Sequence, residues 1–269
     1  MQKALIAICK VVPLPLIYGI VSLVIPFYML IDRKGYRASY RFFRRIGYAP
    51  VRSFFHVYLN EFNLGMVVVD RFAMYAGRKF KMDYSQDKAV KEHLPDKGGF
   101  IMLSSHVGNY EMGGYTFKTN TKRINALVYS GETKAVMEGR EKLFRENNIR
   151  MVEVSEDMSH LFTLVEALGN GEIVSMPADR VYGSGKYFLI PFLGGNARFP
   201  AGPFIFAEKM KVPVIGVIIL KSGVHKYNVW TRELTPAPAV EMAREAVGLA
   251  ETIVKKHPDH WFNFFNIWE

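Results

Sequence analysis

The sequence predicts an α/β fold, in which a mixed central sheet is flanked by helices and a membrane-associated helix lies at the N-terminus. Between residues 100 and 256, short apolar runs alternate with amphipathic stretches, as strands and helices do when they take turns along a chain. Residues 32–95 instead keep a helical pattern. The length of 269 residues suits one catalytic domain. We place it at residues 46–269, and we assign residues 1–45 to membrane-anchoring and interfacial helices.

The uncharged segment at residues 11–31 predicts contact with a membrane. Its 21 residues would form a helix of about 30 Å, which is about the thickness of one hydrocarbon core. Pro13, Pro15 and Pro26 interrupt it, and an interior proline costs a helix about 3 kcal/mol. The sequence therefore leaves open whether the segment spans the bilayer, lies in one leaflet, or is an amphipathic core helix. No small-residue cleavage site follows it, which argues against a secretory signal.

A dense basic flank follows this segment. Basic residues beside an apolar segment favour the cytoplasmic side of a membrane and contact anionic lipid. We therefore expect a cytoplasm-facing protein whose second helix lies at the membrane interface. Only Asp32 opposes the basic residues of the flank, which are Arg33, Lys34, Arg37, Arg41, Arg44, Arg45 and Arg52.

The composition of the chain narrows the kinds of molecule that it is expected to bind. The net charge of +10 favours a polyanionic partner, such as nucleic acid, acidic phospholipid or an acidic carrier protein. No recognisable nucleic-acid-binding motif with base-stacking aromatics is present, so we expect no nucleic-acid partner. The single Cys9 cannot form an intramolecular disulfide or a multi-cysteine metal site.

The alternating region places the candidate site. In open α/β sheets, ligands bind beyond the carboxyl ends of strands, so we expect the site in the loops that open at Ser105, Tyr129 and Pro177. We predict strands at residues 100–104, 124–129, 150–154, 172–176, 187–191, 214–220 and 227–231, and helices at 109–118, 133–147, 159–168, 203–211 and 240–256.

A histidine and a carboxylate follow the first of these strands. The run is Ser105-His106-Val107-Gly108-Asn109-Tyr110-Glu111. A Gly-Asn turn between them lets the carboxylate fold back on the imidazole, which predicts His106 as general base and Glu111 as the group that fixes its tautomer. Such a dyad suits direct acyl transfer from a thioester to a hydroxyl. Without context the pattern is weak, because a lone histidine, here one of seven, is more often a satisfied core or surface group.

The same run resembles a known signature. His-x-Gly-Asn-Tyr-Glu is similar to the His-x-Gly-Asn-Trp-Glu motif of the bacterial lipid A late acyltransferases, the lauroyl and myristoyl transferases, whose relatives include the phosphatidylinositol mannoside acyltransferases. The resemblance covers most of the chain from residue 100 onward. Its further matches, in order, are Gly139-Arg140, Met176-Pro177-Ala178-Asp179-Arg180, Ile190-Pro191-Phe192-Leu193-Gly194-Gly195, Pro200-Ala201-Gly202-Pro203, Val212-Pro213-Val214 and His257-Pro258-Asp259-His260-Trp261.

This resemblance implies roles for five residues. His106 would be the base, Glu111 its orienting acid and Asp179 a second acidic group near the site. Arg140 and Arg180 would face phosphate or the reacting carbonyl, as arginines that follow strands can. Gly194 and Gly195 have no chemical role in this scheme and predict a tight turn.

The resemblance also implies the reactants and the location. A fatty acyl chain would pass from acyl-carrier protein or acyl-CoA, as co-substrate, to a hydroxyl of a glycolipid or lipid A-like acceptor, with no cofactor and no metal. The protein would act at the cytoplasmic face of the bacterial inner membrane. Two departures weaken transfer of the acceptor: Tyr110 replaces the usual Trp, and Arg180 and Val181 stand where the lipid A enzymes carry Gln and Asp.

Other signals are weaker. The run Gly183-Ser184-Gly185-Lys186 lacks the first glycine and the Ser/Thr of a phosphate-binding loop, and neither a serine-hydrolase elbow nor a His-Glu-x-x-His zinc motif is present.

Two alternative functions stay open: a lipid esterase or hydrolase that uses the same dyad to activate water, and a non-enzymatic basic membrane-binding protein. Free fatty acid without an acylated product would indicate the hydrolase, and loss from membranes in high salt would indicate the binding protein.

Overall fold

The computed structural model describes residues 2–86, 89–112, 122–128, 148–181 and 185–269. The predicted α/β fold with a mixed central sheet is confirmed. The predicted helix at 133–147, and most of the one at 109–118, lie outside the described residues.

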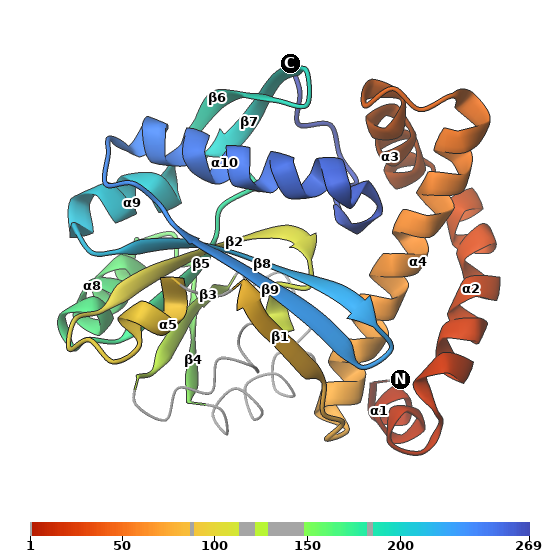
Figure 1. The fold of residues 1–269 in the computed structure, drawn as a ribbon, viewed down its shortest axis with the longest axis horizontal. Coiled ribbons are helices and arrows are strands. Elements are labelled where there is room, and N and C mark those ends of the chain that lie inside the picture. Colours follow the sequence, from red (N-terminus) through yellow and green to blue (C-terminus); the bar gives the residue numbers. More distant parts are fainter. Residues whose placement is uncertain (1, 87–88, 113–121, 129–147, 182–184) are drawn as a thin grey trace.

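The N-terminal part of the chain forms a group of helices beside the sheet, with α4 between the sheet and α2 (Figure 1). Proline separates the first two helices, because Pro13 is the N-cap of α2 and Pro15 lies in its first turn, where no backbone donor is lost. Asp32 begins the next helix by accepting a 3.0 Å hydrogen bond from the Gly35 amide. The four helices are α1 (Gln2–Val11), α2 (Leu14–Ile31), α3 (Arg33–Arg45) and α4 (Pro50–Tyr75).

The central sheet has seven strands in the order β1-β9-β8-β2-β5-β3-β4. Only the β8–β9 pair is antiparallel, and the other neighbours run parallel. The strands are β1 (Lys81–Gln86), β2 (Phe100–Gly108), β3 (Ile124–Val128), β4 (Ile149–Glu153), β5 (Ile173–Pro177), β8 (Val214–Gly223) and β9 (Lys226–Glu233). A separate hairpin joins β6 (Tyr187–Phe192) and β7 (Gly195–Pro200).

The middle strand β2 is buried on both faces. Ile101 and Leu103 contribute to one hydrophobic core, and Phe100 and Met102 contribute to the core on the opposite face. The first core also receives α8 (Ser159–Gly169), α9 (Gly202–Met210) and α10 (Ala239–Lys256), and the second receives α5 (Ala89–His93).

Two strands differ from the sequence analysis. The helical pattern expected for residues 32–95 is wrong at β1, which pairs with β9 alone at the sheet edge. Met82 and Tyr84 alternate with polar neighbours, but over five residues only, and the sequence analysis missed this short strand, which is paired on one side by β9. The second missed strand is β7, whose pairing with β6 is set by the predicted tight turn, in which Leu193 and Gly194 have φ of 49° and 78°.

The last residues, 257–269, form a strap between α4 and β2, which we call the C-terminal strap. It begins with the short helix η1 (Pro258–His260). On the α4 side, His56 Nδ1 lies 2.6 Å from Asp259 Oδ1, and Asn60 Nδ2 donates to the Trp261 carbonyl at 2.9 Å. On the β2 side, Trp261 forms an antiparallel bridge with Val107. The strap therefore ties α4 to the end of the strand that carries the candidate site.

Substitution of Gly108 by alanine should destabilise the fold. Gly108 has φ of +74°, and a Cβ there would lie 2.1 Å from the Ile219 carbonyl oxygen. We expect Gly108→Ala to lower the free energy of unfolding by more than about 2 kcal/mol, because backbone strain adds to a clash. Gly194→Ala is the control, since its φ is +78° but nothing lies within 4 Å of the added carbon. Urea unfolding followed by circular dichroism measures both, and equal losses would contradict the clash.

Acid should weaken the fold through His260 of the C-terminal strap. Burial, with the nearby charges of His257 and Lys221, lowers the pKa of His260 to about 4. A histidine in an unfolded chain has a pKa of about 6.5, so between these values the unfolded chain binds a proton that the folded chain excludes. The stability contributed by neutral His260 is therefore complete above that window and is lost as pH falls through it.

The measurement is the melting temperature of the protein and of His260→Asn at about pH 7 and about pH 5. The substitution removes the titrating group, so the variant should lose less stability on acidification than the parent. An identical loss in both proteins would show that His260 has no part in it.

Candidate active site

The end of β2 departs from regular pairing where His106 lies. β2 pairs with β5 as far as Ser104 and Pro177, and its register with β8 shifts between Ser104 and Gly108. Because β2 and β5 are parallel, their carboxyl ends meet at one edge of the sheet, and Asp179 follows β5 by two residues. The loops predicted to open at Ser105 and Pro177 are therefore neighbours, whereas Tyr129 lies outside the described residues.

His106 is held by the carboxylate of Asp179. The imidazole Nδ1 lies 2.8 Å from Asp179 Oδ1, and the backbone N–H of His106 donates to Asp179 Oδ2 at 2.6 Å. A carboxylate accepts at Nδ1, so the neutral ring carries its proton there and presents an unprotonated Nε2. The two side chains are 13% and 11% exposed, which leaves the pair largely shielded but within reach of a reactant.

The electrostatics keep Asp179 ionised. Burial is the largest single influence and acts to raise the pKa of Asp179. The attraction of a protonated His106, the two hydrogen bonds from His106 and the charge of Arg180 together outweigh it. The net result is a pKa below the ordinary value of an aspartate. The carboxylate is therefore charged at neutral pH and can stabilise the imidazolium that forms when Nε2 takes a proton.

Glu111 is placed differently from the sequence prediction. Its carboxylate accepts a 3.0 Å hydrogen bond from Arg71 Nη1 of α4, and no hydrogen bond joins it to His106. The orienting contact that the sequence assigned to Glu111 is made by Asp179. The positive φ of Gly108 turns the chain after β2, and the salt bridge with α4 then holds Glu111. A catalytic role for Glu111 stays a prediction.

The other residues of the motif build the turn after His106. Gly108 is required by its positive φ and by its approach to the Ile219 carbonyl. Asn109 is buried. Its backbone N–H donates to the Ile219 carbonyl at 2.7 Å, and its side-chain Nδ2 donates to the Tyr227 hydroxyl at 3.2 Å. Tyr110 contacts the imidazole through its ring, with centroids 5.0 Å apart.

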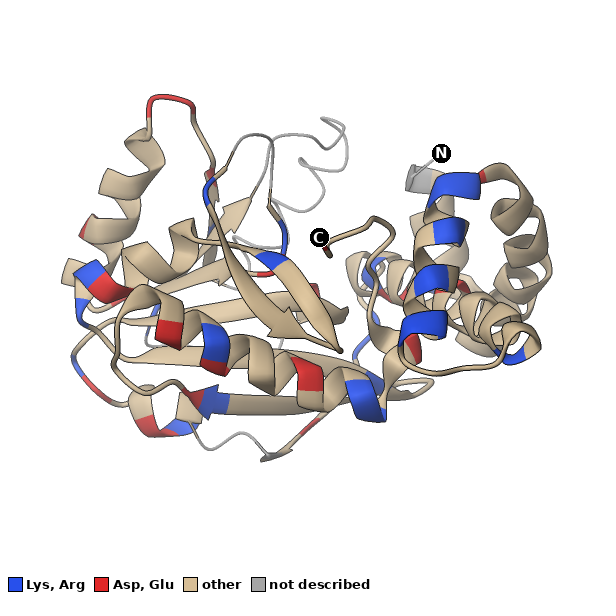
Figure 2. Ribbon diagram, turned by 90° about the horizontal axis from the view of Figure 1, so that it is seen from above, with Lys and Arg blue, Asp and Glu red and all other residues tan. Residues whose placement is uncertain are grey.

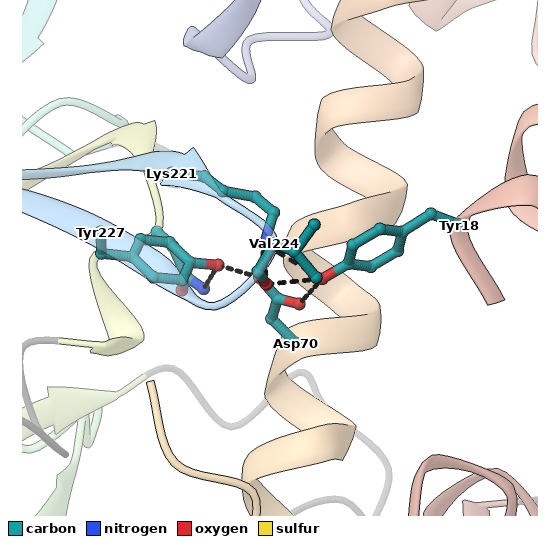
Figure 3. A network of polar contacts seen from close by, with 6 residues as sticks. Tyr18, Asp70, Lys221, Val224 and Tyr227 are labelled. Atoms are coloured by element: carbon teal, nitrogen blue, oxygen red, sulfur yellow. Dashed lines mark hydrogen bonds and ion pairs between the residues drawn. The ribbon is translucent and has the colours of Figure 1, made fainter. Parts of the chain in front are cut away.

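Behind this turn lies a buried polar network that the sequence analysis missed (Figure 3). Asp70 of α4 accepts hydrogen bonds from the Tyr18 and Tyr227 hydroxyls and from Lys221 Nζ. These donors offset the cost of burying the Asp70 carboxylate, which has no exposed surface. Through Tyr227 and Asn109 the network reaches the turn after His106. No sequence pattern announces it, because its members lie far apart along the chain.

Of the two arginines predicted to bind substrate, the structure describes Arg180 alone. Arg180 Nη2 donates to the Phe262 carbonyl at 2.7 Å, and its guanidinium carbon lies 5.6 Å from the Phe265 ring centroid. Its buried Nε has no hydrogen-bond partner among the described residues. Arg180 thus holds the C-terminal strap beside His106, and its role toward a substrate stays a prediction. Arg140 lies outside the described residues.

A small cavity lies next to Asp179, between the sheet and the helices α9 and α10. Its volume of about 30 Å³ has room for about two water molecules, which is too little for a fatty acyl chain. Leu103, Ser105 and Phe204 are among its lining residues. Within the described parts of the chain, no three His, Cys, Asp or Glu side chains gather in a way that would hold a metal ion.

Fold and site together define an α/β protein with a histidine–carboxylate pair of the kind used in general-base chemistry. Comparison with protein families specifies the class. The model of the family described as bacterial lipid A biosynthesis acyltransferase matches residues 62–269, which is the larger part of the chain. The protein belongs to this family, and it is an acyltransferase for a lipid-like acceptor. A search of curated proteins found no match.

Two isosteric substitutions distinguish the carboxylates. Asp179→Asn should lower the rate of acyl transfer by at least about 100-fold, because the amide neither fixes the correct tautomer nor stabilises the imidazolium. Glu111→Gln should lower it much less, since Glu111 bonds Arg71 rather than the imidazole. Initial rates with a labelled acyl donor measure both. A larger loss in Glu111→Gln than in Asp179→Asn would return the orienting role to Glu111.

Proposed function

We propose that this protein is a membrane-associated O-acyltransferase of glycolipid synthesis. It moves a fatty acyl chain from acyl-carrier protein or acyl-CoA to a hydroxyl of a glycolipid or lipid A-like acceptor, at the cytoplasmic face of the bacterial inner membrane. The observation that carries the proposal is the contact between His106 and Asp179, which leaves Nε2 available as a base. Membership of the acyltransferase family supports the choice of acyl transfer among general-base reactions.

The proposed reaction needs no covalent acyl-enzyme. His106 Nε2 takes the proton of the acceptor hydroxyl as its oxygen attacks the carbonyl carbon of the thioester. A C–O bond forms, the C–S bond breaks, and the imidazolium returns the proton to the departing thiolate. Asp179 holds the ring in place and stabilises its charged form between these proton transfers.

The remaining predicted residues have supporting roles. Arg180 would face an acceptor phosphate or the oxygen of the reacting carbonyl, as the family motif implies. Its Nε is a buried donor without a hydrogen-bond partner among the described residues. Glu111 fixes the turn after His106 to α4 through Arg71. Arg140 is proposed for phosphate binding from its place in the family motif.

Charge and apolar surface support the proposed reactants. A net charge of +10 suits either donor, since carrier proteins are acidic and coenzyme A carries phosphates. The exposed apolar side chains of α2 suit a bilayer in which the acceptor lipid would be presented.

Replacement of the proposed base tests the function. His106→Ala should reduce formation of labelled lipid from a labelled acyl thioester and a total lipid extract by at least about 100-fold, because the hydroxyl then has no base. His93→Ala is the matched control, since His93 lies on α5 and bonds Asp96 and Glu233 away from the site. Thin-layer chromatography separates acylated lipid from free fatty acid.

Two outcomes would contradict the proposal. Free fatty acid without acylated lipid would indicate the hydrolase, in which water replaces the acceptor hydroxyl. Unchanged transfer by a folded His106→Ala protein would exclude His106 as the base.

A further inference from the structure

We infer that α2 lies along the surface of an anionic bilayer, in one leaflet, and does not cross it. The inference rests on the proposed membrane association and specifies its geometry. Among the described residues, α2 is the one helix long and apolar enough to span a membrane. Its 18 residues would extend about 27 Å, close to the thickness of the hydrocarbon core. Length alone therefore permits both arrangements, and the packing of α2 decides between them.

One face of α2 is buried against the rest of the protein along the whole helix. The buried residues are Leu14, Ile17, Tyr18, Ile25 and Met29, which extend from the first turn of the helix to the last. In the middle, Tyr58 of α4 donates to the Ser22 carbonyl at 3.2 Å, and Gly65 of α4 gives the closest approach, since a Cβ there would lie 2.6 Å from Val21 Cγ1. The two helices therefore form a packed pair.

The catalytic domain lies beside this pair along its length. Near the start of α2, Tyr18 bonds to Asp70 and to Val224 of the β8–β9 hairpin. Near the middle of α4, the side-chain amides of Asn60 and Asn63 each donate to the backbone carbonyl of Asp259, in the C-terminal strap, at 3.1 Å. A transmembrane α2 would carry these contacts, and the domain that makes them, into the bilayer.

Polar groups of the domain oppose that placement. Asp70 and Lys221, which contact Tyr18 near the start of α2, would lie at membrane depth, where charged side chains are costly even when they are paired. The hairpin at Val224 would add strand-end backbone groups that lipid cannot hydrogen-bond. Figure 1 shows the arrangement, with α4 running beside α2 and the sheet on the other side of α4.

The opposite face of α2 is apolar and exposed. Leu16, Leu23 and Leu30 are 62%, 73% and 72% exposed, and their spacing of seven residues places them in one stripe. A stripe of this kind needs an apolar partner. Val51, Phe54 and Phe55 at the start of α4 are exposed as well.

The basic residues of α3 indicate that the partner of the apolar stripe is an anionic bilayer. The helix α3 begins two residues after α2 ends, and basic residues recur along it (Figure 2). An apolar stripe beside exposed arginines is the pattern of a helix in the membrane interface, where the arginines meet lipid phosphates. All the basic residues of α3 are exposed, namely Arg33, Lys34, Arg37, Arg41, Arg44 and Arg45.

Spin labels on the stripe distinguish the two arrangements. Leu16→Cys, Leu23→Cys and Leu30→Cys are made in a Cys9→Ala background, labelled with a nitroxide, and bound to vesicles of phosphatidylcholine and phosphatidylglycerol. Collisions with oxygen and with a water-soluble nickel chelate give the depth of each label. Phe162→Cys on α8, where the native side chain is 79% exposed, provides a label in water as a control.

A helix in the interface places the three stripe labels at one shallow depth, about 5–10 Å below the head groups. A transmembrane helix would place Leu23 at the bilayer centre, with the two other labels about 10 Å nearer to opposite surfaces. The second profile overturns the inference but leaves the proposed function intact. Failure of the protein to bind these vesicles would overturn the membrane association itself, and the transfer assay with His106→Ala reports on the chemistry independently of both.

Discussion

The structure depends on the way a single residue, His106, is fixed from three sides. Asp179 binds both its imidazole and its backbone N–H, and the Phe262 N–H donates to its carbonyl at 3.0 Å. Arg180 then holds the Phe262 carbonyl. The ring is therefore positioned by β2, by the loop after β5 and by the C-terminal strap. Such preorganisation lets a base act without first paying for its own ordering.

The same region is stabilised from behind by a buried ion pair. Isolated, the Asp70 carboxylate would be expensive to bury, and burial indeed raises its pKa while lowering that of Lys221. The two tyrosine hydroxyls supply the remaining hydrogen bonds, so the cost is offset. Because these four residues come from α2, α4, β8 and β9, loss of one would disturb both the N-terminal helices and the turn after His106.

The sequence was informative where the signal is local. Alternating apolar and amphipathic stretches predicted most strands and helices of the described chain to within a few residues, and the motif around His106 identified the proposed base. The partner of His106 could not be read in the same way. Glu111 is near in sequence, whereas Asp179 is near only because β2 and β5 pair in parallel. The resemblance placed Asp179 near the site but assigned the orienting role to Glu111.

Other omissions have the same physical origin. β1 is a polar edge strand that takes its conformation from β9, and the Asp70 network joins residues up to 209 positions apart, from Tyr18 to Tyr227. The alternation in β1 covers only five residues, and the Asp70 network leaves no periodic pattern in the sequence. Tertiary pairing decides both, which is why local propensity missed them.

The helices that precede the family match pack against the core that carries the candidate site. The match begins at residue 62, yet Phe42 of α3 packs edge-on against Trp261, with ring centroids 4.7 Å apart, in the core that also contains Leu103 of β2. The boundary expected at residue 45 falls at the end of α3, and packing contacts continue across it. A membrane surface that bound α2 and α3 would thus bind helices that pack against the core carrying His106, and this packing would set the height of the proposed base above the lipid. An acceptor hydroxyl in a lipid head group lies at that surface, so the anchor would serve to position the enzyme relative to its substrate as well as to retain it.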